Sequence, residues 1–75
     1  MEYYRDWDKD SGVEAYEIGS GYIIVRFKQG RNRNYKYTTS SAGENNIWRM
    51  HQLAQQGDGL NEFIVENHIQ YESKW

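Results

Sequence analysis

The spacing of apolar residues changes near the middle of the chain, and this change separates a strand region from a helical region. Three segments follow the two-residue period that is typical of strands with one buried face: 12–18, 22–28 and 35–39. In the second segment Ile23, Val25 and Phe27 form an apolar face, and charged residues end the other face. Two connectors of hairpin length separate the strands: 19–21 and 29–34. The pattern therefore predicts a three-stranded antiparallel meander.

Beyond residue 40 the apolar residues recur at three- and four-residue intervals, which is the period of a helix with one buried face. The first predicted helix begins at a capping box formed by Ser41 and Glu44, and it ends at Gly57. Asp58 or Gly59 is expected to cap a second short helix. The apolar face of the first helix comprises Ile47, Met50, His51 and Ala54, with Leu53 beside it. The face of the second comprises Leu60, Phe63, Ile64, His68 and Tyr71.

A run of strands followed by a run of helices predicts an α+β domain with both short helices packed on one face of the sheet. Residues 1–10 lack any period and are expected to form a loosely ordered N-terminal arm. Residues 11–75 are then a single domain, because 75 residues suffice for only one. The expected core has ten members: Val13, Ile23, Val25, Phe27, Ile47, Met50, Ala54, Leu60, Phe63 and Ile64.

Cysteine is absent, so disulfides and thiolate metal sites are excluded, and aromatic residues, 16% of the chain, are expected to fill the small core. The first residues have neither the basic region nor the apolar region of a signal peptide. The longest apolar run, at 22–25, is too short to cross a bilayer. We therefore expect a cytoplasmic protein that makes no membrane contact.

Charge is strongly partitioned along the chain, although the formal net charge is only −2. The segment 26–36 has five basic residues and no acidic one. Residues 1–17 have six acidic residues against two basic ones, and residues 44–74 have five against two. More than half of the positive charge thus lies in one short segment, which makes that segment the most informative functional feature of the sequence.

A surface that follows a nucleic-acid backbone needs cations for the phosphates and aromatic rings on which bases stack. The candidate phosphate-binding residues are Arg26, Lys28, Arg31, Arg33 and Lys36. The candidate stacking residues are Tyr35 and Tyr37. Strand geometry turns Lys36 away from both tyrosines, so either the tyrosines or the charges are expected on the outer sheet face. The alternative interpretation is a solvated hairpin whose charges protect a sheet edge from aggregation.

Residues 6–17 place acids where an EF-hand calcium loop has them: Asp6, Asp8, Asp10 and Glu17. The sharp turn of such a loop requires glycine where this chain has Ser11, and too few residues precede the loop to form its entering helix. His51 and His68, with Glu66 nearby in sequence, lie on the apolar faces of two different helices, as histidines at the edge of a core do. We therefore expect no bound metal and no cofactor.

Residues 11–71 resemble the KTSC domain, a short module named for the C-terminus of some lysyl-tRNA synthetases. The resemblance rests on these positions: Val13, Tyr16, Ile23-x-Val25-x-Phe27, Gly30, Tyr35-Lys36-Tyr37, Leu53-Ala54, the segment from Gly57 to Asn61-x-Phe63-Ile64, and Tyr71. The connector before Tyr35 is longer and more basic than the family pattern, and no Val-Pro-like entry into the helix follows Tyr37. The resemblance implies a small α+β fold and, through the synthetase, RNA binding.

The chain lacks the groups on which most enzymes depend, namely a cysteine nucleophile, a serine in a nucleophile elbow and a glycine loop that cradles phosphate. We therefore predict a non-enzymatic binding domain. Its leading partner is RNA or another nucleic acid, bound weakly and in a salt-dependent manner, because acidic segments flank the basic one. The alternative is a protein-interaction or self-association module that uses an exposed sheet edge, where main-chain pairing supplies affinity.

Overall fold

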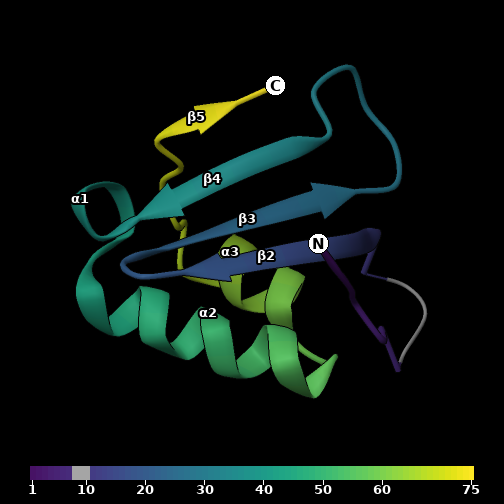
Figure 1. Ribbon diagram of the computed structural model, residues 1–75, viewed down its shortest axis with the longest axis horizontal. Coiled ribbons are helices and arrows are strands. Elements are labelled where there is room, and N and C mark those ends of the chain that lie inside the picture. The colour runs from purple at the N-terminus through teal and green to yellow at the C-terminus, as the bar shows by residue number, and fades with distance from the viewer. Residues whose placement is uncertain (8–10) are drawn as a thin grey trace.

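One antiparallel sheet with the strand order β1-β2-β3-β4-β5 organises the chain (Figure 1). The computed structural model describes residues 1–7 and 11–75, and within them it has five strands and three helices. The strands are β1 (Glu2–Tyr3), β2 (Val13–Gly19), β3 (Tyr22–Phe27), β4 (Asn34–Thr38) and β5 (Ser73–Lys74). The helices are α1 (Thr39–Ala42), α2 (Glu44–Gln56) and α3 (Leu60–Glu66). The predicted α+β class is confirmed.

The predicted meander forms the centre of the sheet, as β2, β3 and β4. The sheet is wider than predicted because β1 pairs with β2 and β5 pairs with β4, so each end of the described chain adds an edge strand. Both added strands have two residues. A segment this short shows no period, and its pairing partner lies far away in the sequence, so a pattern search does not detect it.

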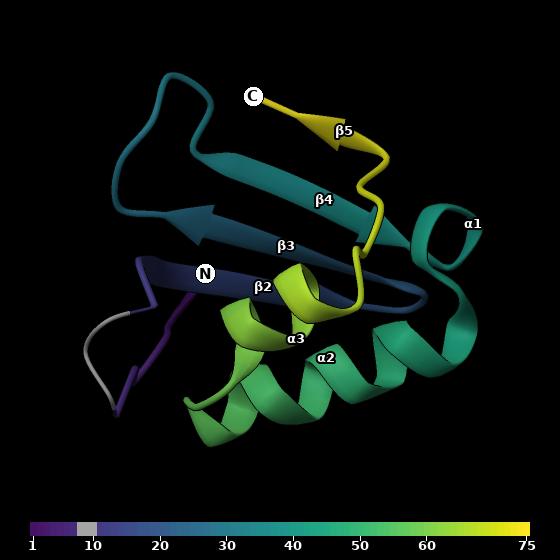
Figure 2. The same cartoon turned by 180° about the vertical axis from the view of Figure 1, so that it is seen from behind.

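The helices cover one face of the sheet, and Figures 1 and 2 show α2 and α3 on the same side of it. Cross-strand register pairs Ile23 with Tyr37 and Val25 with Tyr35, which places these side chains on the helix-covered face. Eight of the ten predicted core residues are buried; Phe27 and Phe63 are partly buried and pack against the core. The buried cluster has five further members: Tyr4, Tyr16, Tyr37, Leu53 and Ile69.

The helix boundaries differ from those expected. The capping box lies one turn earlier, where the Thr38 hydroxyl accepts from the Ser41 backbone N–H at 3.2 Å and caps α1. Helix α2 instead starts after Gly43 without a side-chain cap. The box predicted at Ser41 was wrong because the end of β4 leaves Thr38 in the extended backbone conformation that a capping residue requires.

Helix α3 is shorter than predicted, so His68 and Tyr71 do not share its apolar face. The helix ends at Glu66, and His68 has a left-handed backbone conformation with φ of 51°. The Ile69 N–H donates to the Ile64 carbonyl at 3.0 Å, and Ile69 is buried in the core. The helix does not continue, because Ile69 is buried in the core and the residues that follow it pair with β4.

The sequence predicts a loosely ordered arm at residues 1–10, and in the structure hydrogen bonds join Tyr4 and Trp7 of this segment to the helices. The Tyr4 hydroxyl accepts from the Leu60 N–H at 3.2 Å. The Trp7 backbone N–H donates to the Gly57 carbonyl at 3.0 Å, and its indole N–H donates to the Gln56 carbonyl at 2.9 Å. These bonds fasten the segment to the C-terminal end of α2 and the start of α3. The remainder of the expected arm, residues 8–10, lies outside the described residues.

Candidate functional site

The sheet divides the predicted nucleic-acid-binding residues between its two faces. Tyr35 and Tyr37 lie on the helix-covered face, opposite Val25 and Ile23. Arg26 and Lys36 lie on the uncovered face. Of the two arrangements that strand geometry allows, the structure therefore has the one with these charges on the uncovered face and the tyrosines beneath the helices. Arg26 and Lys36 therefore do not share a surface with Tyr35 and Tyr37.

The two arginines beside the uncovered face share one carboxylate. Arg33 Nη2 lies 2.9 Å from Glu14 Oε1, and Arg26 Nη1 lies 3.9 Å from Glu14 Oε2. Arg26 Nε also donates to Asn34 Oδ1 at 3.1 Å. Since Glu14 comes from β2, a strand outside the basic segment, the segment alone gave no sign of this neutralisation. Phosphates would have to compete with Glu14 for both guanidinium groups.

Lys36 lies above an aromatic ring on the same face. Its Nζ is 5.0 Å from the centre of the Tyr22 ring, within the range of a cation–π interaction. The Tyr22 hydroxyl donates to Glu17 Oε2 at 2.9 Å, and this hydrogen bond is the main reason why the pKa of Tyr22 is raised. The cations of the uncovered face are thus each paired with a neighbouring side chain, which weakens this face as a phosphate-binding surface.

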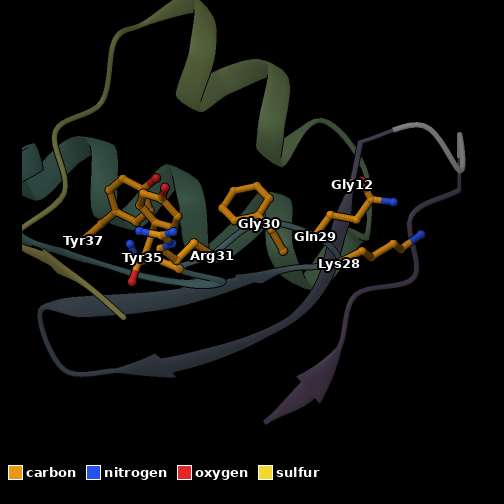
Figure 3. Close-up of a pocket in the computed structure, with 9 residues that line it drawn as sticks. Gly12, Lys28, Gln29, Gly30, Arg31, Tyr35 and Tyr37 are labelled. Atoms are coloured by element: carbon orange, nitrogen blue, oxygen red, sulfur yellow. The ribbon is translucent and has the colours of Figure 1, made fainter.

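A hollow of about 720 Å³ opens on the helix-covered side, under the loop that joins β3 to β4 (Figure 3). Its lining combines loop residues with aromatic side chains of the sheet: Gly12, Phe27, Lys28, Gln29, Gly30, Arg31, Asn32, Tyr35 and Tyr37. Figure 3 shows Tyr35, Tyr37 and Arg31 at one end, and Lys28 extending toward the other. Four of the seven predicted site residues thus line this hollow, and the other three do not.

Tyr37 forms the deeper part of the aromatic wall. Only 3% of the residue is exposed, and burial, followed by the neighbouring Tyr35 and Tyr71, raises the pKa of its hydroxyl to about 12. Among the described residues this hydroxyl has no hydrogen-bond partner. Tyr37 therefore contributes a neutral, unpaired hydroxyl to the hollow at any physiological pH.

Tyr35 lies nearer the surface, between two other rings. Its ring centre is 5.5 Å from that of Phe27 and 5.1 Å from that of Tyr71, and both contacts are edge-to-face. Lys74 of β5 adds a cation, with Nζ 6.0 Å from the Tyr35 ring centre and 5.5 Å from that of Tyr71. Lys74 is not among the residues predicted from the sequence, because only the pairing of β5 with β4 brings it beside Tyr35.

The two cations that line the hollow differ in their partners. Arg31 has no carboxylate or hydrogen-bond acceptor within bonding distance among the described residues. Lys28 Nζ lies 3.7 Å from Asp6 Oδ2. Within the hollow, Arg31 is therefore the cation most available to a ligand.

The two histidines lie in different surroundings. His51 Nε2 lies 2.8 Å from the Tyr22 carbonyl oxygen; because a carbonyl only accepts, the ring nitrogen carries the proton, and the bond joins α2 to β3. His68 is exposed in the turn after α3. Within residues 1–7 and 11–75, no group of three or more histidines and acids is placed to hold a metal ion. The calcium-loop pattern falls partly on Asp8 and Asp10, which lie outside the described residues.

Comparison with known proteins adds no further assignment. No protein-family profile, curated protein or solved structure matches this chain. The resemblance to the KTSC domain therefore stays a prediction. In the part of the chain that the structure describes, no helix combines the length and the apolar character that a bilayer crossing requires.

Proposed function

We propose that this chain is a non-enzymatic domain that binds single-stranded nucleic acid by taking one nucleotide into the hollow under the β3–β4 loop. One observation carries the proposal: an aromatic wall borders the same cavity as the guanidinium of Arg31, which has no partner among the described residues. An aromatic face suits a base, and a guanidinium suits a phosphate. The cavity volume of about 720 Å³ is within the range of small-ligand sites, roughly 300 to 1,000 Å³.

The polar groups of the hollow support the same ligand class. The hydroxyls of Tyr35 and Tyr37 and the side-chain amide of Asn32 line the hollow without partners among the described residues. These groups offer both donors and acceptors to the edge of a base. A concave site of this kind suits an unpaired base, since the bases of a duplex are stacked and turned inward.

Electrostatics predict weak binding. Arg26 and Arg33 share the single charge of Glu14, and Lys28 pairs with Asp6. Because Lys36 lies on the uncovered face, the proposed phosphate contacts are limited to Arg31 and to Lys74 at the sheet edge. Each contact with a single-stranded phosphate contributes about −0.7 to the slope of log K against log salt concentration. We therefore expect a slope of about −0.7 to −1.4 and an affinity in the micromolar range or weaker.

Fluorescence anisotropy of labelled oligonucleotides tests the proposal. Tyr35→Leu removes the stacking ring and should weaken single-strand binding by about 5- to 150-fold, the range for one base–aromatic stack. Tyr3→Leu is its matched control, because Tyr3 is 82% exposed on the uncovered face. Arg31→Gln should lower the salt slope by about 0.7, whereas Arg49→Gln, on the exposed side of α2, should not. Equal effects of the paired variants, or equal affinity for duplex, would contradict the proposal.

A second function is favoured by the free edge of β2. Strand β1 pairs only with Ala15 and Tyr16, so Ile18 has no strand partner on that side among the described residues. A smaller hollow of about 420 Å³ adjoins this edge, lined by Met1, Glu2, Tyr16, Glu17, Ile18 and Gln55. An extended segment of another protein can pair there. Ile18→Pro would abolish such pairing and spare oligonucleotide binding, whereas Arg31→Glu would do the reverse.

A further inference from the structure

Lys28 borders the proposed nucleotide site, but its ammonium group is bound elsewhere. Its side chain is about half exposed, at 52%, and its Nζ lies 3.7 Å from Asp6 Oδ2. In Figure 3 the side chain extends away from Tyr35 and Tyr37, toward the N-terminal segment. Lys28 therefore lines the hollow, but its ammonium group is paired with Asp6.

Asp6 depends on this lysine. Only 6% of Asp6 is exposed, and its Oδ2 has no hydrogen-bond partner in the part of the chain that the structure describes. Among the described residues, Lys28 is the only cation within ion-pair distance of the carboxylate. A buried carboxylate without a counter-charge is strongly unfavourable, so moving Lys28 into the hollow would leave Asp6 in a state that the fold opposes.

The main chain keeps Asp6 from following Lys28. On either side of Asp6, the backbone N–H groups of Tyr4 and Trp7 donate to the carbonyls of Glu14 and Gly57, each at 3.0 Å. Asp6 itself has a left-handed conformation with φ of 52°, which is uncommon for residues other than glycine, although Asp adopts it more readily than most. The Asp6 carboxylate is thus held in position, and the flexible Lys28 side chain is the partner that can move.

We infer that the ion pair with Asp6 keeps the Lys28 ammonium group away from an anion in the hollow, and that this pairing limits how tightly the hollow binds anions. In the native protein Arg31 is the acting cation of the lining. Replacing Asp6 by an uncharged residue of the same shape releases Lys28 to the hollow as a second cation. The identity of the anion as a nucleotide phosphate rests on the proposed function. The ion pair between Asp6 and Lys28 does not depend on it.

The first test measures the interaction between Asp6 and Lys28 in the absence of any ligand. In wild-type protein, acetylation of lysines followed by mass spectrometry should show Lys28 reacting more slowly than Lys36, which has no carboxylate partner among the described residues. In Asp6→Asn, Lys28 should react about two- to fivefold faster, as expected for loss of one partly exposed ion pair. The Lys36 rate should stay constant. An unchanged Lys28 rate would show that Asp6 does not hold the ammonium group.

The second test measures the consequence for the hollow with two probes, inorganic triphosphate and a single-stranded oligonucleotide. Asp6→Asn should bind triphosphate about two- to fivefold more tightly, and for the oligonucleotide its salt slope should steepen by about 0.7. The double variant Asp6→Asn/Lys28→Met should return both values to those of the wild type. Unchanged triphosphate affinity in Asp6→Asn overturns the inference. Tighter triphosphate binding with no oligonucleotide binding in any variant upholds the inference and overturns the proposed function.

Discussion

The packing of the N-terminal segment against the end of α2 leads to a quantitative prediction at Gly57. This residue follows the helix with φ of 77°, and a Cβ built on it would lie 2.5 Å from the Arg5 Cβ. Gly57→Ala therefore meets two costs. The left-handed conformation costs about 1 to 2 kcal/mol for a residue with a Cβ. Displacement of Arg5 breaks the two hydrogen bonds of Trp7, which contribute about 0.5 to 1.5 kcal/mol each.

We expect Gly57→Ala to lower the free energy of unfolding by about 2 to 5 kcal/mol. Gly59→Ala is the matched control, because Gly59 has a similar φ of 80° and its added Cβ would lie 3.6 Å from the nearest atom, a Leu53 methyl carbon. This variant should lose only about 1 to 2 kcal/mol of backbone strain. Urea unfolding measures both variants, and the indole of Trp7 should become more exposed to a fluorescence quencher in Gly57→Ala alone. If the two losses agree within about 0.5 kcal/mol, the close approach of Arg5 has no energetic consequence and the reasoning fails.

Three further predictions follow from single contacts. The raised pKa of Tyr37 should make stability fall as pH rises from about 10 to about 12, by about 2 kcal/mol more in wild type than in Tyr37→Phe, which keeps the contributions of Tyr16 and Tyr22, whose pKa values are also raised; pH-dependent urea unfolding measures this. Lys28→Met should destabilise the fold by about 1 to 3 kcal/mol because it leaves Asp6 unpaired, and adding Asp6→Asn should restore most of the loss; a loss that persists in the double variant would contradict the ion-pair explanation. Thr38→Ala should lower the thermal midpoint by removing a cap contribution of about 1 kcal/mol, and the exposed Thr39→Ala should change it far less.

The sequence predicts the parts of this fold in which burial acts locally. Strands β2, β3 and β4 and helix α2 each bury one face, so the period of their apolar residues marks them. Edge strands β1 and β5 show no such signal, because two residues have no period and pairing with a distant strand holds them in place. The misplaced capping box has a similar cause: Thr38 and Ser41 are both capable of capping, and the end of β4 determines which one does so.

The sequence likewise predicts those features of the candidate site that depend on one strand alone. Strand geometry alone showed that Lys36 points away from Tyr35 and Tyr37. The acids that pair with the basic segment, Glu14 and Asp6, come from elsewhere in the chain, so only the folded sheet shows which cations they neutralise. A charge count along the sequence therefore overstated the cationic surface.

The pairing of Trp75 with Asn34 has a practical consequence for any binding assay. The two residues exchange backbone hydrogen bonds of 2.9 Å in each direction, at the point where the β3–β4 loop enters β4. A purification tag, dye or surface linker attached after Trp75 would therefore project beside the opening of the hollow and obstruct a ligand. Attachment before Met1, next to the strand at the opposite edge of the sheet, leaves that opening clear.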